Sequence, residues 1–142
     1  MALGEIQSTT FLAGTALLGQ IYAGLQSSVI YDGTTALTPK FALANIAAST
    51  TDGALVAAVA SKKIRVLTWI ALAAATATNL TFTSKPAGAG SAISALFALG
   101  ITNGAAQGFS PIGHFETVAG QGLSVTTGAG STVGVQVVYV EV

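Results

Sequence analysis

The amino-acid sequence predicts an all-β fold, an antiparallel jelly-roll-like sandwich with an N-terminal arm that is extended or partly helical. From Phe41 onward, short apolar runs alternate with breaks of small residues, which is typical of a sandwich or barrel. Seven or eight candidate strands fall within about 100 residues, and this number suits two four-stranded sheets. No repeat of fixed period appears in the 142 residues, so a solenoid is not expected.

The sequence divides near Pro39 into an arm, residues 1–40, and a β-domain, residues 41–142. Within residues 11–25, the side chains of Leu17, Ile21 and Leu25 would share one face of a helix. Three glycines interrupt this stretch, and each costs about 1 kcal/mol in a helix interior. We therefore expect an arm that orders against a neighbouring subunit. Asp32 and Gly33 then indicate a hairpin or loop turn.

The expected strands are residues 41–48, 54–60, 64–73, 79–84, 123–126 and 132–142. Residues 93–101 form a further apolar run whose periodicity does not distinguish helix from strand. Alternation in residues 64–73 places four apolar side chains on the same face of the strand, namely Ile64, Val66, Ile70 and Leu72. In residues 79–84, Leu80 and Phe82 are expected to face inward.

The last strand is apolar on both faces, which is unusual for an antiparallel sandwich. Val133, Val135 and Val137 would lie on one face, and Val138 and Val140 on the other. Outward-facing valines indicate that a partner or another copy of the chain covers this face.

Charged residues make up 7% of the chain, against about 25% in a typical soluble protein. Five cations balance five anions, and zero net charge favours association. A nucleic-acid partner is not expected, because phosphate binding needs a basic surface. The chain has no cysteine, so disulfides and thiolate chemistry are excluded for this sequence.

A mean hydropathy of +0.71 raises the possibility of a membrane protein. The charge-free run of residues 6–31 is long enough to span a bilayer, but polar side chains reduce its apolar part to residues 11–25. That part is too short for a spanning helix, and Glu5 is not the basic start of a signal peptide. A membrane partner is therefore not expected.

Candidate catalytic residues are few. His114 is the only histidine, and with Glu116 it could form a metal-binding or acid–base pair, or it could be an ordinary loop histidine. The five acidic residues are scattered along the sequence, without the spacing of a calcium loop. Two Gly-x-Gly pairs lack the strand-to-helix context of a dinucleotide site. We therefore expect no enzyme, no metal and no cofactor.

Three of the five cations, Lys62, Lys63 and Arg65, lie within four residues at an expected turn. They could make an electrostatic contact with an acidic surface. They could equally form a solvated hairpin tip that prevents edge-to-edge aggregation. Trp69, the only tryptophan, is expected in the core or as an interface anchor.

Residues 47–142 resemble short structural proteins encoded in the head and tail modules of tailed bacteriophages. The segments that carry the resemblance are AASTTDGALVAAVASKKIRVLTWIALAAATATNLTFTS and PIGHFETVAGQGLSVTTGAGSTVGVQVVYVEV. In such proteins an aromatic–acidic step, here Phe115-Glu116-Thr117, leads into a glycine-rich turn and the last two strands. The resemblance covers about two-thirds of the chain, and residues 1–40 match no family pattern.

This resemblance implies a jelly-roll virion protein, most similar to capsid decoration (cement) proteins. Such proteins commonly form trimers on the outer surface of the phage capsid and clamp neighbouring major capsid protein subunits. The implied partners are thus the major capsid protein and the chain itself, as a homotrimer. The candidate interface residues are Phe11, Leu12, Leu17, Leu18, Ile21, Tyr22, Leu25, Val138 and Val140. The alternatives are a head- or tail-fibre or receptor-binding module, and a lectin-like domain.

Overall fold

The computed structural model describes residues 30–101 and 103–142, and every regular element in them is a β-strand. The chain divides into two units, with the boundary between Ala36 and Leu37. The described part of the first unit contains β1 (Ile30–Asp32), which forms a hairpin with β2 (Thr35–Leu37), a strand that ends one residue past this boundary. Its two-residue turn follows Asp32, which confirms the predicted hairpin turn. The helix considered for residues 11–25 lies outside the described residues.

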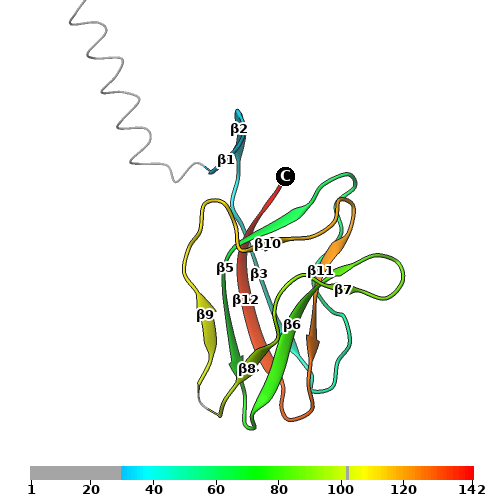
Figure 1. The fold of residues 1–142 in the computed structure, drawn as a ribbon, viewed down its shortest axis with the longest axis vertical. Coiled ribbons are helices and arrows are strands. Elements are labelled where there is room, and N and C mark those ends of the chain that lie inside the picture. The colour runs from blue at the N-terminus through cyan, green and yellow to red at the C-terminus, as the bar shows by residue number, and fades with distance from the viewer. Residues whose placement is uncertain (1–29, 102) are drawn as a thin grey trace, which may run out of the picture. The chain divides into compact units, whose positions relative to one another are not determined.

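The second unit contains the other ten strands, most of which are labelled in Figure 1. They are β3 (Lys40–Ile46), β4 (Gly53–Val56), β5 (Ile64–Ala73), β6 (Thr78–Lys85), β7 (Ser91–Ala92), β8 (Phe97–Leu99), β9 (Ala105–Gln107), β10 (Phe115–Glu116), β11 (Gly122–Thr127) and β12 (Val133–Glu141).

These strands form two antiparallel sheets that pack into a β-sandwich (Figure 1). In sheet 1 the order is β10-β5-β12-β3, and β9 pairs with the same edge of β5 as β10. In sheet 2 the order is β4-β11-β6-β7, and β8 also pairs with β6. The chain alternates between the sheets from β3 to β6, and the predicted all-β antiparallel sandwich is confirmed.

An aromatic cluster holds the two sheets face to face. The rings of Trp69 from sheet 1 and Phe82 from sheet 2 lie 5.2 Å apart between centroids, in an edge-to-face arrangement. Phe97 lies 4.5 Å from Trp69, and Phe115 lies 4.8 Å from Phe82. Trp69 and Phe82 are buried, so Trp69 is a core residue, as one of its two interpretations predicted.

A β-bulge interrupts the pairing of β5 with β12. Val138 lies opposite Thr68, but Tyr139 lies opposite Val66, so Leu67 is an extra residue on β5. The bulge reverses the alternation of side chains beyond it. The predicted faces of this strand were therefore wrong in part: Ile64 and Val66 are buried, whereas Ile70 and Leu72 are exposed.

Two other predicted elements are shorter than expected. The segment 54–60 is a strand only to Val56, where its pairing with β11 ends opposite Leu123. In the segment 93–101 the structure shows a strand, β8, rather than a helix, because its backbone pairs with β6 at Leu80.

The outer face of sheet 2 is polar, and Asp52 fastens a loop onto it. The Asp52 carboxylate accepts hydrogen bonds from the Gly90 N–H at 2.7 Å and from the Thr83 hydroxyl at 2.9 Å. The Lys85 ammonium lies 3.5 Å from the same carboxylate. The Gly90 N–H, together with Thr83 and Lys85, holds the pKa of Asp52 below its ordinary value. The β6–β7 loop is thus tied to the start of β4.

We predict that Gly90→Ala lowers the free energy of unfolding by about 1–3 kcal/mol, because the new Cβ would overlap Asp52 Oδ1 and break this contact. Gly88→Ala in the same loop is the matched control, since nothing lies within 4 Å of its Cβ position. Urea unfolding measures both variants. Equal stability of the two would show that the Asp52 contact does not hold the loop.

Candidate functional site

Five apolar side chains lie together on the outer face of sheet 1. They are Phe41 and Leu43 of β3, Ile70 and Leu72 of β5, and Val138 of β12, and we call them the apolar patch. In the strand register, Phe41 lies opposite Val138. Gln136 of the middle strand lies opposite Leu43 on one side and opposite Ile70 on the other. Phe41 is 57% exposed and Leu43 61% exposed, so this face is open to solvent in the single chain.

Side-chain size is distributed unusually across this sheet. On β3, Ala42 and Ala44 pack against the core, while the larger Phe41 and Leu43 point outward. On β5, the buried Ala71 and Ala73 alternate with exposed Ile70 and Leu72. Within residues 41–44 and 70–73, the larger apolar side chains therefore point outward and the alanines face the core.

Sheet 2 shows the usual arrangement and serves as a comparison within the same molecule. Its outward register positions carry Thr81, Thr83, Lys85, Ser124 and Thr126. Outer faces of antiparallel sandwiches are normally polar in this way. The apolar outer face of sheet 1 is therefore a specific feature, of the kind that marks a protein–protein contact.

Two shallow hollows in the apolar patch give it shape. The larger has a volume of about 330 Å³, and its lining includes Phe41, Ala106 and Val138. The smaller, of about 150 Å³, is lined in part by Leu43 and Leu72. Ile70 and Gln136 border both hollows, and no charged side chain lines either of them.

The two valines predicted to face outward differ in the structure. Val138 is half-buried and belongs to the apolar patch. Val140 is fully buried, so its prediction as an exposed interface residue was wrong. At this end of the sheet both faces are covered, since Tyr139 is buried as well. On the outer face, Val140 lies beside Arg65, its cross-strand partner.

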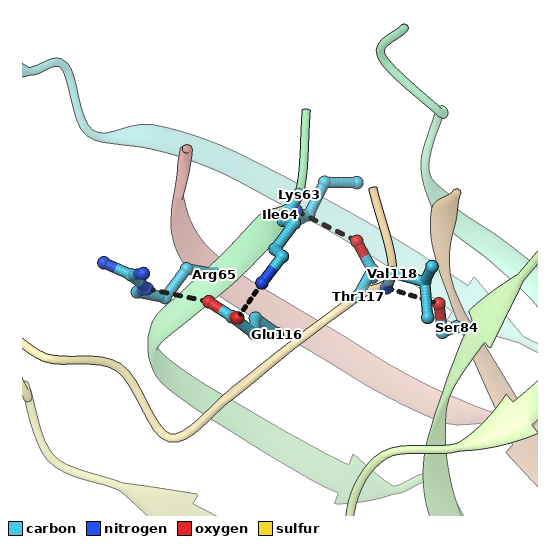
Figure 2. Close-up of polar contacts among 7 residues, drawn as sticks. All are labelled: Lys63, Ile64, Arg65, Ser84, Glu116, Thr117 and Val118. Carbon is cyan, nitrogen blue, oxygen red and sulfur yellow. Dashed lines mark hydrogen bonds and ion pairs between the residues drawn. The ribbon is translucent and has the colours of Figure 1, made fainter. Parts of the chain in front are cut away.

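Two cations of the basic cluster predicted at residues 62–65 share one carboxylate of the same chain (Figure 2). Glu116 Oε1 lies 2.6 Å from Lys63 Nζ, and Glu116 Oε2 lies 3.1 Å from Arg65 Nε. Hydrogen bonds from Lys63 first, and then from Arg65, hold the pKa of Glu116 below its ordinary value. Among the described residues, Lys62 alone of the three cations makes no ion pair, which corrects the prediction of a three-charge tip.

The residues that follow Glu116 fasten it between the two sheets (Figure 2). Thr117 exchanges two hydrogen bonds with Ile64 of sheet 1: its hydroxyl accepts from the Ile64 N–H at 2.9 Å, and its N–H donates to the Ile64 carbonyl at 3.0 Å. The Val118 N–H donates to the Ser84 hydroxyl of sheet 2 at 2.9 Å. This connection therefore links both sheets and positions Glu116 over Lys63 and Arg65.

His114 and Glu116 do not form the metal-binding or acid–base pair considered from the sequence. The His114 ring nitrogen Nε2 lies 2.7 Å from the Gly108 carbonyl, while Glu116 is engaged by Lys63 and Arg65. The described part of the chain holds no group of three or more His, Cys, Asp or Glu side chains placed to bind a metal ion. In residues 30–101 and 103–142, no helix has the length and apolar character needed to cross a membrane.

Most of the apolar patch was not predicted from the sequence. Phe41, Leu43, Ile70 and Leu72 were not singled out as surface residues, although the Phe-Ala-Leu-Ala order of β3 carried the signal of alternating size. The seven candidate interface residues between Phe11 and Leu25 lie outside the described residues.

Comparisons of this chain with protein-family models, with curated proteins and with solved structures find no match. Its function must therefore be inferred from its own surfaces and sequence.

We predict that Glu116→Gln lowers the free energy of unfolding by about 0.5–1 kcal/mol at pH 7, a value discounted because all three side chains are partly exposed. A lowered pKa in the folded state means that the contribution is present above the ordinary value of 4.5 and is lost as the pH falls through the folded value. The difference between wild type and Glu116→Gln should thus shrink below pH 4.5.

Urea unfolding from pH 7 to pH 3 measures this difference. Lys63→Met should reproduce part of the loss, and Lys62→Met is the control that should leave stability unchanged. A difference that stays constant across this pH range would contradict the assigned role of Glu116.

Proposed function

We propose that this protein is a virion structural protein of a tailed bacteriophage, a capsid decoration (cement) protein without catalytic activity. In this proposal it binds the major capsid protein on the outer surface of the phage head and assembles as a homotrimer. The observation that carries the proposal is the apolar patch on sheet 1, an uncharged surface that needs a protein partner. The phage assignment is supported by the sequence resemblance of residues 47–142.

We also propose that the sandwich is a jelly roll, and the strand order supports this. Sheet 1 runs β3-β12-β5 and ends in β9 and β10, while sheet 2 runs β4-β11-β6 and ends in β7 and β8. If β7 with β8, and β9 with β10, each count as one interrupted strand, the sandwich has eight strands in two four-stranded sheets. First and last strands are then neighbours, as in two Greek keys wound into a jelly roll.

The free energy gained by covering the apolar patch once is small, which favours an assembly with repeated contacts over a single contact. Covering a fully exposed side chain of this size contributes about 1.5–3 kcal/mol. The five patch side chains are roughly half exposed, so covering them contributes on the order of 4–7 kcal/mol. Association itself costs about 4–15 kcal/mol, so one such contact is marginal. Repeated contacts in a trimer on a shell lattice overcome this cost through avidity.

Charge pairing within the sandwich supports association through apolar surface. Eight charged side chains lie between Leu37 and Val142, and seven of them form ion pairs with one another. Lys40 pairs with Glu141, Lys85 with Asp52, and the Glu116 cluster accounts for the others. Of the five cations and three anions in this segment, Lys62 is the one without an ion pair.

The arm has a separate role in this proposal. Residues 11–25 carry no charge, and when extended, about 20 residues of chain reach 65–70 Å. We propose that this segment contacts the capsid shell. The alternative function is a head- or tail-fibre or receptor-binding module, which would place the same trimer at one vertex or at the tail instead of across the head surface.

We predict that the protein binds purified phage heads that lack it, with many copies per head, and that cryo-electron microscopy places it on the outer surface. Deleting residues 1–26 should leave the β-sandwich folded by circular dichroism and weaken binding about tenfold or more, because the arm contacts are lost. Binding confined to the tail would support the fibre alternative. Unaltered binding of the truncated protein would remove the arm from the interface.

We predict that attachment to heads changes little between low and high salt, because most charges of the sandwich are already paired within the chain. Lys62→Glu, which reverses the one charge of the basic cluster without an ion pair, should bind like wild type. A fall in affinity with salt that Lys62→Glu removes would instead establish the electrostatic contact with an acidic shell surface.

A further inference from the structure

We propose that the β9–β10 loop of one copy inserts its apolar tip into the apolar patch of the next copy, so that the copies join head to tail in a closed ring. The tip consists of Phe109 and Ile112, which lie outside the apolar patch. This inference rests on the proposed homo-oligomer and identifies the surfaces that form it.

The tip is an exposed and well-supported structure. Ile112 is 82% exposed and Phe109 is 56% exposed. Between them the chain turns at Ser110: its carbonyl accepts from the Gly113 N–H at 3.1 Å, and its hydroxyl donates to the Gly113 carbonyl at 3.3 Å. Gly113 has a φ of +84°, which favours glycine.

Both ends of the tip are fixed to β5. The Ser110 N–H donates to the Leu67 carbonyl, and the His114 N–H donates to the Val66 carbonyl, each at 2.8 Å. Any side chain at Gly113 would collide with the aliphatic stem of Arg65, so the loop lies directly on the sheet edge. A tip held in this way loses little conformational freedom when it binds.

The apolar patch has the size and chemistry to receive this tip. Its larger hollow, of about 330 Å³, is bordered by Phe41, Ile70 and Val138. An apolar cavity of about 150 Å³ is enough to hold benzene, so this hollow can accept a phenyl ring or an isoleucine side chain. Tip and patch are both uncharged, and Gln136 offers a neutral amide at the centre.

The tip does not fill the patch of its own chain, since Ile112 is almost fully exposed there. Every copy therefore carries one unfilled patch and one unused tip. Contact between tip and patch can be exchanged reciprocally by two copies in a two-fold dimer, or it can run head to tail from copy to copy into a ring or a filament. The homotrimer of the proposed function requires the head-to-tail form. A closed trimer satisfies the tip and the patch of all three copies.

The absence of cysteine from the sequence allows a direct test by engineered disulfides. An equimolar mixture of the full-length variants Ile112→Cys and Val138→Cys should form mixed disulfide dimers on mild oxidation. The double variant Ile112→Cys/Val138→Cys should form covalent trimers, because each copy then links to two neighbours. Leu96→Cys replaces Val138→Cys as the control, since Leu96 is 65% exposed but lies outside the tip and the patch.

Sedimentation of the full-length protein provides the second test. Ile112→Asp should weaken self-association roughly 30-fold or more, as expected for a hot-spot side chain, and leave the circular dichroism spectrum unchanged. Leu96→Asp is the matched control and should sediment like wild type.

Three outcomes would overturn this inference. The first is a wild-type protein that sediments as a monomer at micromolar concentration. The second is an oligomer that Ile112→Asp does not weaken. The third is an oligomer in which Ile112→Cys cross-links as readily to Leu96→Cys as to Val138→Cys. If wild type and Ile112→Asp bind heads equally well as oligomers, the interface assignment fails while the proposed function stands.

Discussion

The β-bulge at Leu67 determines which side chains of β5 reach the core, and both surfaces of sheet 1 depend on it. With the extra residue, Val66 and Trp69 face inward on either side of the bulge. Trp69 can then pack against Phe82 of sheet 2, while Ile70 and Leu72 turn outward into the apolar patch. A regular strand would place Trp69 outside and Ile70 inside, and the sandwich would lose its central aromatic contact.

The strands with strong alternation could be predicted from sequence, and the bounds of β5 agree with the prediction to the residue. Its faces could not be predicted, because a bulge depends on pairing with β12 and leaves no mark in the local pattern. The strands β7 and β10 have two residues each and are defined by their pairing with a neighbouring strand. Two residues are too few to show an alternating pattern in the sequence. Val140 was placed outside by alternation, yet it is covered because the sheet end is buried on both faces.

The ion pairs of the basic cluster could not be predicted from the sequence. Lys63 and Arg65 lie close to other cations in sequence, and the carboxylate that both of them contact, Glu116, lies 53 and 51 residues away. The connection through Thr117 and Val118 brings that carboxylate to them and ties the two sheets together. The ion pairs lie away from the apolar patch, whose two hollows are lined without any charged side chain.

The position of β12 in sheet 1 has a consequence for the timing of folding. This strand lies between β3 and β5 and pairs with both, although both are synthesised long before it. Neither the patch nor its supporting core can form until the chain has been translated through Glu141. Such long-range pairing slows folding. It also means that an incomplete nascent chain cannot display the patch, so the assembly proposed above would begin only with molecules whose synthesis has passed this point.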